Sequence, residues 1–429
     1  MRFDCLHPAD QLVMMMQRIY RYGMTTTTGG NLSVRDENGD VWITPSGIDK
    51  GSLTRADMVQ IKPDGTQAGI HRPSVELPLH LRIYQLRPDL RAVLHAHPPT
   101  MVAFSLVRRP PSLRLIPDVQ DICGRVGVAK YAVPGSELLG ENIAGCFADG
   151  CNTVLMENHG CVVGAGNLLE AFMAFETLDF SGRMELEALK LGLPRFLSDR
   201  QLQEYVKLKD SNPEAFEPEV AASAERAARR DMCGFIHRSY DQRLFTAAQG
   251  ALSLRLDKND FLINPLGRDR RTLQPEDMAL IRDGLCQAGK APSRCMPLHR
   301  AIYDAHPDIG CVLTARPPSI MAFAVTGTPF DSRLIPESYI ALRSVKKLPF
   351  LSSVKDVPGT VGMLGPRSPV LLIENEGVVV TGRDLLNAFD RLEVLEYSAR
   401  AVIAARDIGR VVQIDEAQVR EIEQVFHLE

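Results

Sequence analysis

The two halves of this chain repeat one another, and this constrains its fold more than any other feature of the sequence. Residues 30–35, Gly-Asn-Leu-Ser-Val-Arg, recur at 250–255 as Gly-Ala-Leu-Ser-Leu-Arg. Further matches in the same order pair residues 44–47 with 264–267, 57–58 with 277–278, 78–80 with 297–299, 88–89 with 307–308, 116–117 with 335–336, 133–135 with 357–359 and 167–172 with 384–389. A period of about 220 residues indicates duplicated domains, because the units of solenoid proteins are far shorter.

The length agrees with a duplication. At 429 residues the chain is too long for one ordinary hydrophobic core and suits two domains of about 200 residues each. We expect one domain over residues 1–191, a linker over 192–221 and a second domain over 222–429. The linker region contains Pro194, Pro213 and Pro218 among many charges, which is typical of a linker with a short helical piece.

Local patterns predict that each domain is of the α/β class. In the first half, apolar residues at helical spacing predict an N-terminal helix, and two short β segments around 32–34 and 41–44 flank a turn, which suggests a hairpin. A helix at about 76–86, strands at 92–97, 153–157 and 160–163, and a long helix from Leu168 complete the pattern. Hairpins where crossovers would be needed favour an antiparallel or mixed sheet.

The composition of the chain bears on its binding partners and on the cellular compartment. A formal net charge of -4 gives no electrostatic reason to expect nucleic acid or an anionic membrane surface. No apolar run approaches the roughly 20 residues that span a bilayer, and the N-terminal residues have no apolar signal-peptide core. Nine cysteines without a Cys-x-x-Cys pair indicate reduced, buried thiols, so we expect a cytoplasmic protein.

Three histidines of the first half are missing at the matching positions of the second. Residues 94–99 read Leu-His-Ala-His-Pro-Pro, whereas 313–318 read Leu-Thr-Ala-Arg-Pro-Pro. Residues 156–160 read Met-Glu-Asn-His-Gly, whereas 373–377 read Ile-Glu-Asn-Glu-Gly. Core or surface histidines need not vanish together, but the ligands of one ion should, so we interpret His95, His97 and His159 as metal ligands.

The chemistry of such a cluster follows from its geometry. Side chains alternate faces along a strand, so His95 and His97 point the same way. His159 follows another strand and completes a set of three. Three protein ligands leave an open coordination position, which is typical of catalytic rather than structural zinc sites.

Glu76 is the candidate general acid/base. It ends the run Pro-Ser-Val-Glu at 73–76, and its counterpart in the second half is Cys295. A carboxylate beside a divalent ion can move a proton to or from carbon. The alternative is a glutamate that merely favours the dipole of a helix N-terminus, but its loss together with the histidines favours catalysis.

Turns rich in small and polar residues form a candidate anion pocket. Such turns expose backbone N–H groups and hydroxyls, which suit a phosphate or carboxylate. The candidate substrate-binding residues are Gly30, Asn31, Thr44, Ser46, Gly47 and Ser74. Asn31, Thr44 and Ser46 become Ala, Asn and Leu in the second half, so the pocket is lost along with the histidines.

His80 behaves differently, because the second half retains it as His299. Since that half lacks the candidate site, we interpret His80 as mainly structural.

Taken together, these motifs resemble the class II aldolase/adducin family. The match covers residues 29–33, 44–47, 73–76, 95–99 and 158–160, and it recurs in weakened form in the second half. The resemblance implies two tandem α/β/α domains, each a central, mostly antiparallel sheet flanked by helices, of which the second is degenerate. It also implies zinc, or another divalent ion such as Mn²⁺ or Co²⁺, on His95, His97 and His159, with Glu76 as catalytic acid/base. The turns would then hold a substrate phosphate, and subunits would form four-fold rings.

Two departures from the family pattern bear on the substrate. Sugar-phosphate aldolases of this family often have a second Ser before the Glu, where this chain has Val75. They also tend to carry a Tyr proton donor after the Ile-Pro run, where this chain has Asp118 and Asp121, so Asp121 is a candidate second catalytic residue.

We therefore predict a carbon–carbon lyase that cleaves a small anionic hydroxy-carbonyl or sugar-phosphate-like substrate through a metal-stabilised enediolate. One alternative is a metal-dependent decarboxylase of a keto acid or an aromatic hydroxy acid. Another is a non-catalytic scaffold like adducin. The resemblance predicts a homo-oligomer, either two chains in a pseudo-four-fold ring or a tetramer.

Overall fold

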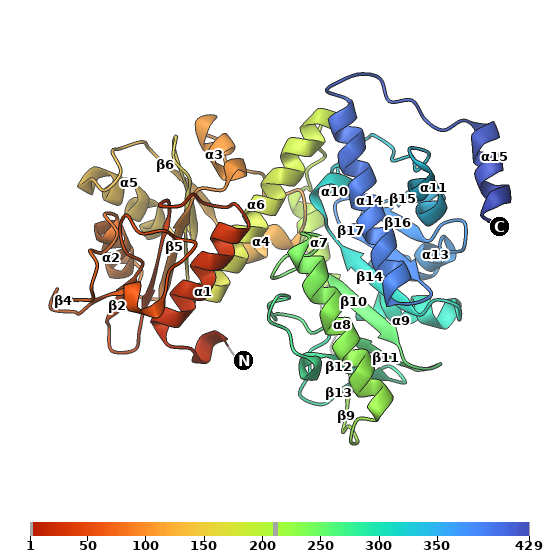
Figure 1. Ribbon diagram of the computed structural model, residues 1–429, viewed down its shortest axis with the longest axis horizontal. Helices are drawn as coiled ribbons and strands as arrows, with labels where there is room; N and C mark the ends of the chain where they lie inside the picture. The colour runs from red at the N-terminus through yellow and green to blue at the C-terminus, as the bar shows by residue number, and fades with distance from the viewer. Residues whose placement is uncertain (1–2, 209–212, 429) are drawn as a thin grey trace. The chain divides into compact units, whose positions relative to one another are not determined.

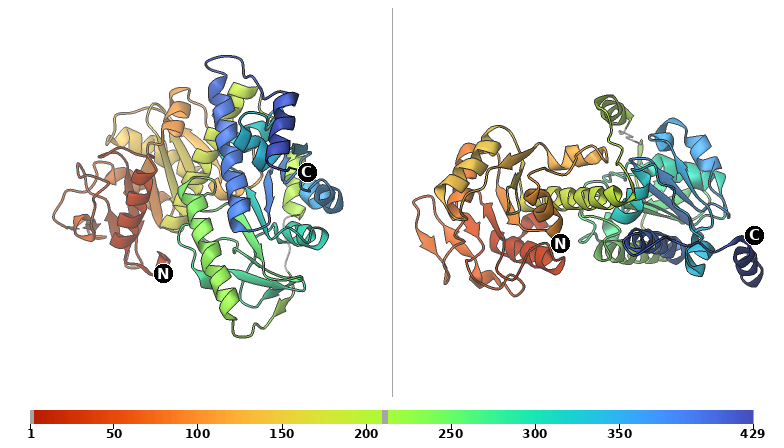
Figure 2. Two further views of the ribbon diagram at one scale, coloured as in Figure 1. Left: turned by 45° about the vertical axis from the view of Figure 1, so that its right-hand side comes forward. Right: turned by 90° about the horizontal axis from the view of Figure 1, so that it is seen from above.

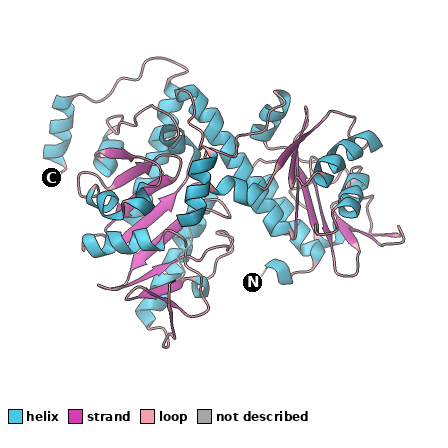
Figure 3. Cartoon of the chain, turned by 180° about the vertical axis from the view of Figure 1, so that it is seen from behind, coloured by secondary structure: helices cyan, strands magenta, loops and turns pink. Residues whose placement is uncertain are grey.

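The computed structural model describes residues 3–208 and 213–428, which form two compact units. The first unit contains the described residues up to Leu113 together with Asp118–Arg183. The second contains Arg114–Pro117 together with the described residues from Met184 onward. Figure 1 labels the elements of both units, and Figure 3 shows that each has a layer of strands with helices against it.

The first unit is built on an eight-stranded mixed sheet. Its strands are β1 (Asn31–Arg35), β2 (Val41–Ile43), β3 (Val59–Ile61), β4 (Gln67–Ala68), β5 (Ala92–Ala96), β6 (Val126–Ala129), β7 (Thr153–Met156) and β8 (Cys161–Ala165). Their order across the sheet is β4-β3-β2-β1-β5-β8-β7-β6. Neighbouring strands run antiparallel except for the parallel pair β6–β7.

The second unit repeats this order and adds one strand. Its strands are β9 (Ala215–Phe216), β10 (Ala251–Arg255), β11 (Asp260–Ile263), β12 (Ala279–Arg282), β13 (Leu285–Gln287), β14 (Cys311–Ala315), β15 (Val345–Leu348), β16 (Val370–Ile373) and β17 (Gly377–Gly382). The order β15-β16-β17-β14-β10-β11-β12-β13-β9 matches the first sheet strand for strand, with β9 added at the edge. Two mostly antiparallel sheets of one topology confirm the predicted fold class.

Helices flank both sheets. Those of the first unit are α1 (Pro8–Arg21), α2 (Leu77–Leu86), α3 (Pro99–Leu106), α4 (Asp118–Cys123), α5 (Glu137–Ala148) and most of α6 (Leu168–Leu191), which is one continuous helix (Figure 2). Those of the second are α7 (Asp199–Leu208), α8 (Ser223–Asp241), α9 (Met296–Ala305), α10 (Pro318–Ala324), α11 (Pro336–Leu342), α12 (Ser352–Lys355), α13 (Val357–Gly362), α14 (Leu385–Ala405) and α15 (Glu416–Val425). Among the described residues, no helix is both long and apolar enough to cross a membrane.

Packing against α2 and α5 determines which face of the first sheet carries the candidate site. The apolar core on this face joins Ile83 of α2 and Phe147 of α5 to strand residues that include Val93 of β5. Because side chains alternate along a strand, His95 lies on the same face as Val93. Helix α1 packs against β1 and β2 and buries Leu12, Met15, Met16 and Ile19, the apolar residues that predicted it.

The structure confirms most of the predicted elements and adds one. The expected strand at 92–97 ends one residue early, so that His97 follows β5, and the helix expected from Glu76 begins at Leu77 with Glu76 as its N-cap. The region predicted as a linker contains α7, as expected, and also β9, which pairs with β13. Part of that region, residues 209–212, lies outside the described residues.

Candidate metal centre and active site

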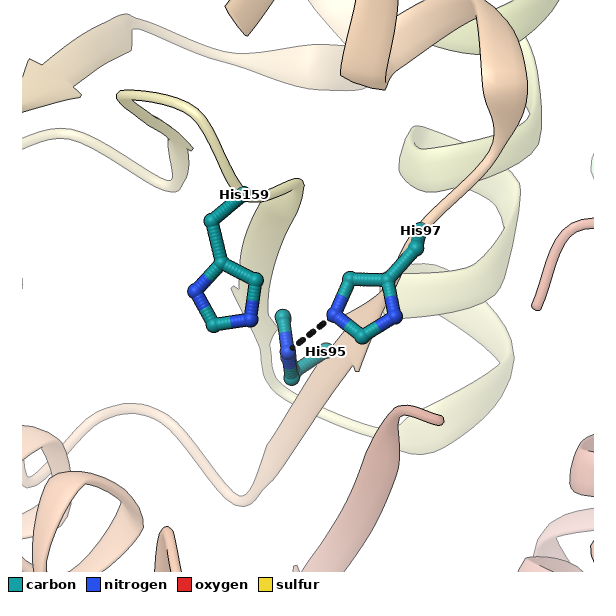
Figure 4. Close-up of side chains that lie close together, drawn as sticks. All are labelled: His95, His97 and His159. Atoms are coloured by element: carbon teal, nitrogen blue, oxygen red, sulfur yellow. Dashed lines mark hydrogen bonds between the residues drawn. The ribbon is translucent and has the colours of Figure 1, made fainter. Parts of the chain in front are cut away.

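Three histidines from three neighbouring segments converge on one point. His95 is the penultimate residue of β5, His97 follows the end of that strand, and His159 lies in the turn between β7 and β8. Their ligand nitrogens all lie within 4.8 Å of one another. Figure 4 shows the three imidazole rings turned toward each other. Because β5 pairs directly with β8, the sheet itself brings the two histidine motifs together.

Backbone geometry around the histidines requires particular residues. Asn158 adopts a positive φ of 55°, a conformation that asparagine tolerates better than most residues, in the turn that presents His159. A Cβ on Gly160 would lie 2.6 Å from the carbonyl oxygen of Ala96. A Cβ on Gly30, whose φ is +71°, would lie 2.7 Å from the carbonyl oxygen of His95. These glycines therefore allow the neighbouring chain to approach the histidine strand closely.

The imidazoles have the protonation that ligands need. His95 Nδ1 lies 3.0 Å from the carbonyl oxygen of Cys161, to which it donates its proton, so Nε2 presents a lone pair to the cluster. His95 Nε2 and His97 Nε2 face each other at 2.9 Å. Burial lowers the pKa of His97 to about 3 and that of His159 to about 4, so both are neutral near pH 7. Three imidazoles at this spacing fit a divalent cation such as zinc.

Glu76 lies beside this cluster. Its Oε2 is 3.3 Å from His95 Nε2 and accepts a hydrogen bond of 2.7 Å from Asn31 Nδ2. Burial by itself raises the pKa of Glu76, but His95, the Asn31 hydrogen bond, His159 and His80 together bring it below the ordinary value. The other oxygen, Oε1, is buried and has no hydrogen-bond partner among the residues that the structure describes. The side chain is thus an anion with one oxygen anchored and one free.

The two predicted anion-binding turns lie side by side. Pro45 and Pro73 form an isolated antiparallel bridge, and the Ser74 N–H donates to the carbonyl of Thr44. The hydroxyl of Thr44 accepts from the N–H of Leu32, and that of Ser74 accepts from the N–H of Glu76. Both hydroxyls act as acceptors in these contacts, and both side chains are buried.

Lys50 is a residue that the sequence analysis did not single out. It is almost completely buried, and its ammonium donates to the carbonyl oxygen of Pro45, in the same turn as Thr44. Burial lowers the pKa of Lys50 to about 8, which leaves it mostly protonated at pH 7. The sequence did contain a signal for Lys50, because the second half has another basic residue, the buried Arg270, at the matching position.

The other residues discussed from the sequence lie beside Glu76 or on helix α4. Asn31 donates to Glu76 and contacts His80, so both atoms of its amide are engaged within the protein. Val75 is 65% exposed and lies against Gly135. Asp121 lies on α4 with an exposed side chain, and its role stays a prediction.

The matching positions of the second unit are joined by direct protein contacts. The Arg316 Nε donates to the carbonyl oxygen of Glu376, while the Glu376 carboxylate accepts from the Leu351 N–H and the Ser353 hydroxyl. Cys295, at the position of Glu76, has its pKa raised to about 12 by burial. Among the described residues, the histidine cluster of the first unit is the one group that meets the spacing of a metal site.

Comparison with known proteins identifies the class. Residues 10–186 and 230–403 match the family described as Class II Aldolase and Adducin N-terminal domain. These segments cover most of the chain, which therefore belongs to this family as a member with two tandem copies.

The relatives are aldolases and a decarboxylase. An L-fuculose phosphate aldolase of Methanococcus maripaludis is 30% identical over 170 residues, which cover 39% of this chain and 91% of the relative. A 3-oxo-tetronate 4-phosphate decarboxylase of Haemophilus influenzae is 30% identical over 201 residues, which cover 46% of this chain and 94% of the relative. A solved L-fuculose 1-phosphate aldolase is 32% identical to this chain, with a TM-score of 0.43. The match covers 47% of this chain and 94% of the aldolase chain. The family match and the first two relatives support the expected class II aldolase-like lyase.

Proposed function

We propose that this chain is a divalent-metal-dependent carbon–carbon lyase in which Glu76 is the general acid/base. The observation that carries this proposal is the free Oε1 of Glu76, buried beside three converging imidazoles. A buried carboxylate oxygen without a donor is costly, so it marks a position that a ligand or a proton is expected to use.

His95, His97 and His159 would hold the cation. We favour zinc, with manganese and cobalt as alternatives, because imidazole suits several of these ions. When bound, a divalent cation supplies Lewis-acid polarisation of a substrate oxygen.

Glu76 performs the proton transfer. When the carbon–carbon bond breaks, the hydroxyl-bearing carbon becomes the aldehyde, and its hydroxyl gives up a proton. The electron pair of the broken bond stays on the carbon next to the polarised carbonyl, and this carbon must gain a proton. Asn31 holds Oε2 in place, so Oε1 is the oxygen that delivers or removes this proton. Asp121 remains our candidate for a second proton-transfer group.

The substrate that we propose is a small anionic hydroxy-carbonyl compound of the sugar-phosphate type. The hydroxyls of Thr44 and Ser74 would donate to its anionic group, with Gly30, Ser46 and Gly47 completing the pocket. Lys50, held against Pro45, adds a positive charge beneath the same turn. Aldolase relatives that act on phosphorylated sugars agree with this choice.

Decarboxylation of a keto acid or an aromatic hydroxy acid is the second candidate. Val75 makes the pocket less polar than a second serine would, and one relative is a decarboxylase. Loss of CO₂ also leaves an electron pair on a carbon that must be protonated, so the same residues serve both reactions.

The test is a product assay on a panel of phosphorylated hydroxyketones and 3-keto acids. We expect aldehyde release from the first group, and CO₂ release from the second would select the alternative reaction. Glu76→Gln should keep the bound metal and lose roughly 100-fold or more in kcat. Normal turnover in Glu76→Gln would refute the acid/base assignment. A wild-type protein that binds no metal and has no activity would indicate the non-catalytic, adducin-like scaffold instead.

We also propose a homo-oligomer, in which two chains form a pseudo-four-fold ring of four similar domains. The equal strand order of the two sheets supports this arrangement. The first unit also exposes apolar side chains near its site, among them Val75, Tyr131 and Val133. Mass measurement in solution tests the proposal, and a fully active monomer would overturn it.

A further inference from the structure

A chain of hydrogen bonds runs from Glu76 into the core beneath the sheet. His80 is completely buried on α2, one turn beyond Glu76. Its Nε2 lies 2.5 Å from Asn31 Oδ1, and its Nδ1 lies 2.6 Å from Ser33 Oγ. Ser33 Oγ in turn lies 2.8 Å from the hydroxyl of Tyr84. Five side chains are therefore linked in a row that begins at the carboxylate.

The carboxylate determines the direction of the first bonds. Asn31 Nδ2 donates to Glu76 Oε2, so the Asn31 amide turns its carbonyl oxygen toward His80. The carbonyl oxygen accepts only, so His80 must donate from Nε2. Burial keeps the imidazole neutral, with a pKa of about 3, so its one proton is on Nε2 and Nδ1 accepts from Ser33.

Without the N–H of His80, the Asn31 carbonyl oxygen loses its donor, and the contact with Glu76 alone would hold the amide in this orientation. Its two ends are similar in shape and differ only in hydrogen-bonding character. A rotated amide would place its carbonyl oxygen against the Glu76 carboxylate, and two acceptors repel each other.

The second unit contains the same core contacts without a carboxylate at the end. His299 Nδ1 lies 2.8 Å from Ser253 Oγ, which lies 2.7 Å from the Tyr303 hydroxyl. His299 Nε2 ends on the hydroxyl of Thr314 at 2.8 Å, because Ala251 and Cys295 replace the asparagine and the glutamate. The serine–histidine–tyrosine group is thus common to both units, and its extension to a carboxylate is specific to the first.

We propose that His80 is a positioning residue, which orients the Asn31 amide so that Asn31 anchors Oε2 of Glu76 and leaves Oε1 available for proton transfer. His80 touches neither the substrate nor the cation in this scheme, and it acts only through Asn31. The inference rests on the proposed role of Glu76 as acid/base.

Three substitutions in the full-length protein test the proposal kinetically. His80→Leu removes the N–H, and we expect kcat to fall roughly 10- to 100-fold, the scale of a small misplacement of a catalytic group, with KM and metal content unchanged. His80→Gln restores a donor near the position of Nε2 and should recover most of kcat. His299→Leu removes the matching histidine of the second unit and should leave kcat unchanged.

The matched pair distinguishes positioning from general stability. His80→Leu removes the contact with Ser33, and His299→Leu removes the equivalent contact with Ser253 in a similar core. Equal kcat values for His80→Leu and the wild type, or equal losses in both leucine variants, would overturn the proposal. Failure of His80→Gln to recover activity while its melting temperature matches that of the wild type would also overturn it.

A spectroscopic measurement tests the hydrogen-bond chain without any substrate. In protein labelled with ¹⁵N-histidine, we expect His80 to show a protonated Nε2 and an unprotonated Nδ1, with resonances identified by their absence in His80→Gln. The Nε2 proton resonance should move in Asn31→Ala. A proton on Nδ1 would overturn the inference, whereas full activity of Glu76→Gln with this proton on Nε2 would refute the proposed function alone.

Discussion

The Arg316 side chain donates a hydrogen bond of 2.5 Å from Nε to the backbone carbonyl of Glu376. These two residues occupy the positions of His97 and His159 in the other half of the chain. In the second unit a guanidinium therefore joins the end of β14 to the turn between β16 and β17. In the first unit, a cation held by the histidines would join the equivalent segments.

Removal of metal should therefore destabilise the first unit and spare the second. A cation that binds only the folded protein adds stability by mass action, and at 100-fold excess over its dissociation constant this is about 2.7 kcal/mol. We expect chelation to lower the melting temperature of the first unit by several degrees, as measured by calorimetry with and without dipicolinate. His97→Ala should lose bound metal and turnover, and chelator should no longer shift its melting temperature. An equal shift in His97→Ala would contradict the assignment.

Arg316→Ala should have the opposite pattern. Losing this charge-assisted hydrogen bond should cost the second unit roughly 1.5–3 kcal/mol, because a charged donor is removed from a partly buried carbonyl. Metal content and kcat should not change, since Arg316 belongs to the second unit, which has no counterpart of the three histidines or of Glu76. Denaturant unfolding together with elemental analysis checks both halves of this expectation, and metal loss in Arg316→Ala would argue against a site confined to the first unit.

Val75→Ser should shift the substrate preference toward phosphorylated compounds. The side chain is largely exposed, so the change should cost little stability. A hydroxyl here adds a donor beside Ser74, and one hydrogen bond to a charged group is worth about 1.5–3 kcal/mol, or roughly a 10-fold or greater fall in KM. Kinetics on paired substrates with and without the phosphate measure the effect. An equal change in KM for both members of the pair would mean that residue 75 does not face the anion.

Glu396 should make the stability of the second unit depend on pH. Its carboxylate accepts from the N–H groups of Ser319 and Ile320, and burial, with a contribution from nearby Glu187, raises its pKa to about 7. Because the folded-state pKa lies above the ordinary value of 4.5, this contribution is fully present below about pH 4.5 and is lost as the pH rises through 7.

Glu396→Gln keeps an acceptor oxygen but cannot ionise. Between pH 5 and pH 8 the wild type should lose on the order of 3 kcal/mol relative to this variant, as measured by denaturant unfolding at each pH. Parallel stability curves for the two proteins would show that Glu396 does not titrate in this range.

Local sequence patterns predicted much of the fold. Apolar residues at helical spacing identified α1, and the turn at 36–40 identified the β1–β2 hairpin, because periodicity and turn chemistry act over a few residues. The strand β9 was not foreseen, since a pair of residues becomes a strand only when a distant edge, here β13, offers it hydrogen bonds. The precise end of β5 likewise depends on its neighbours β1 and β8.

The sequence by itself identified the candidate metal ligands and the candidate acid/base, because the second half of a duplicated chain shows what was lost: His95, His97, His159 and Glu76 have no equivalents there. Only the tertiary structure decided how these residues meet and in which direction their hydrogen bonds point. Asn31 and Glu76 are 45 residues apart and Asn31 and His80 are 49 apart, and such contacts form only when β1, β5 and α2 pack together. Retention of His80 in both halves suggested a mainly structural residue, whereas the folded chain places one of its nitrogens in the core and the other against the amide that anchors Glu76.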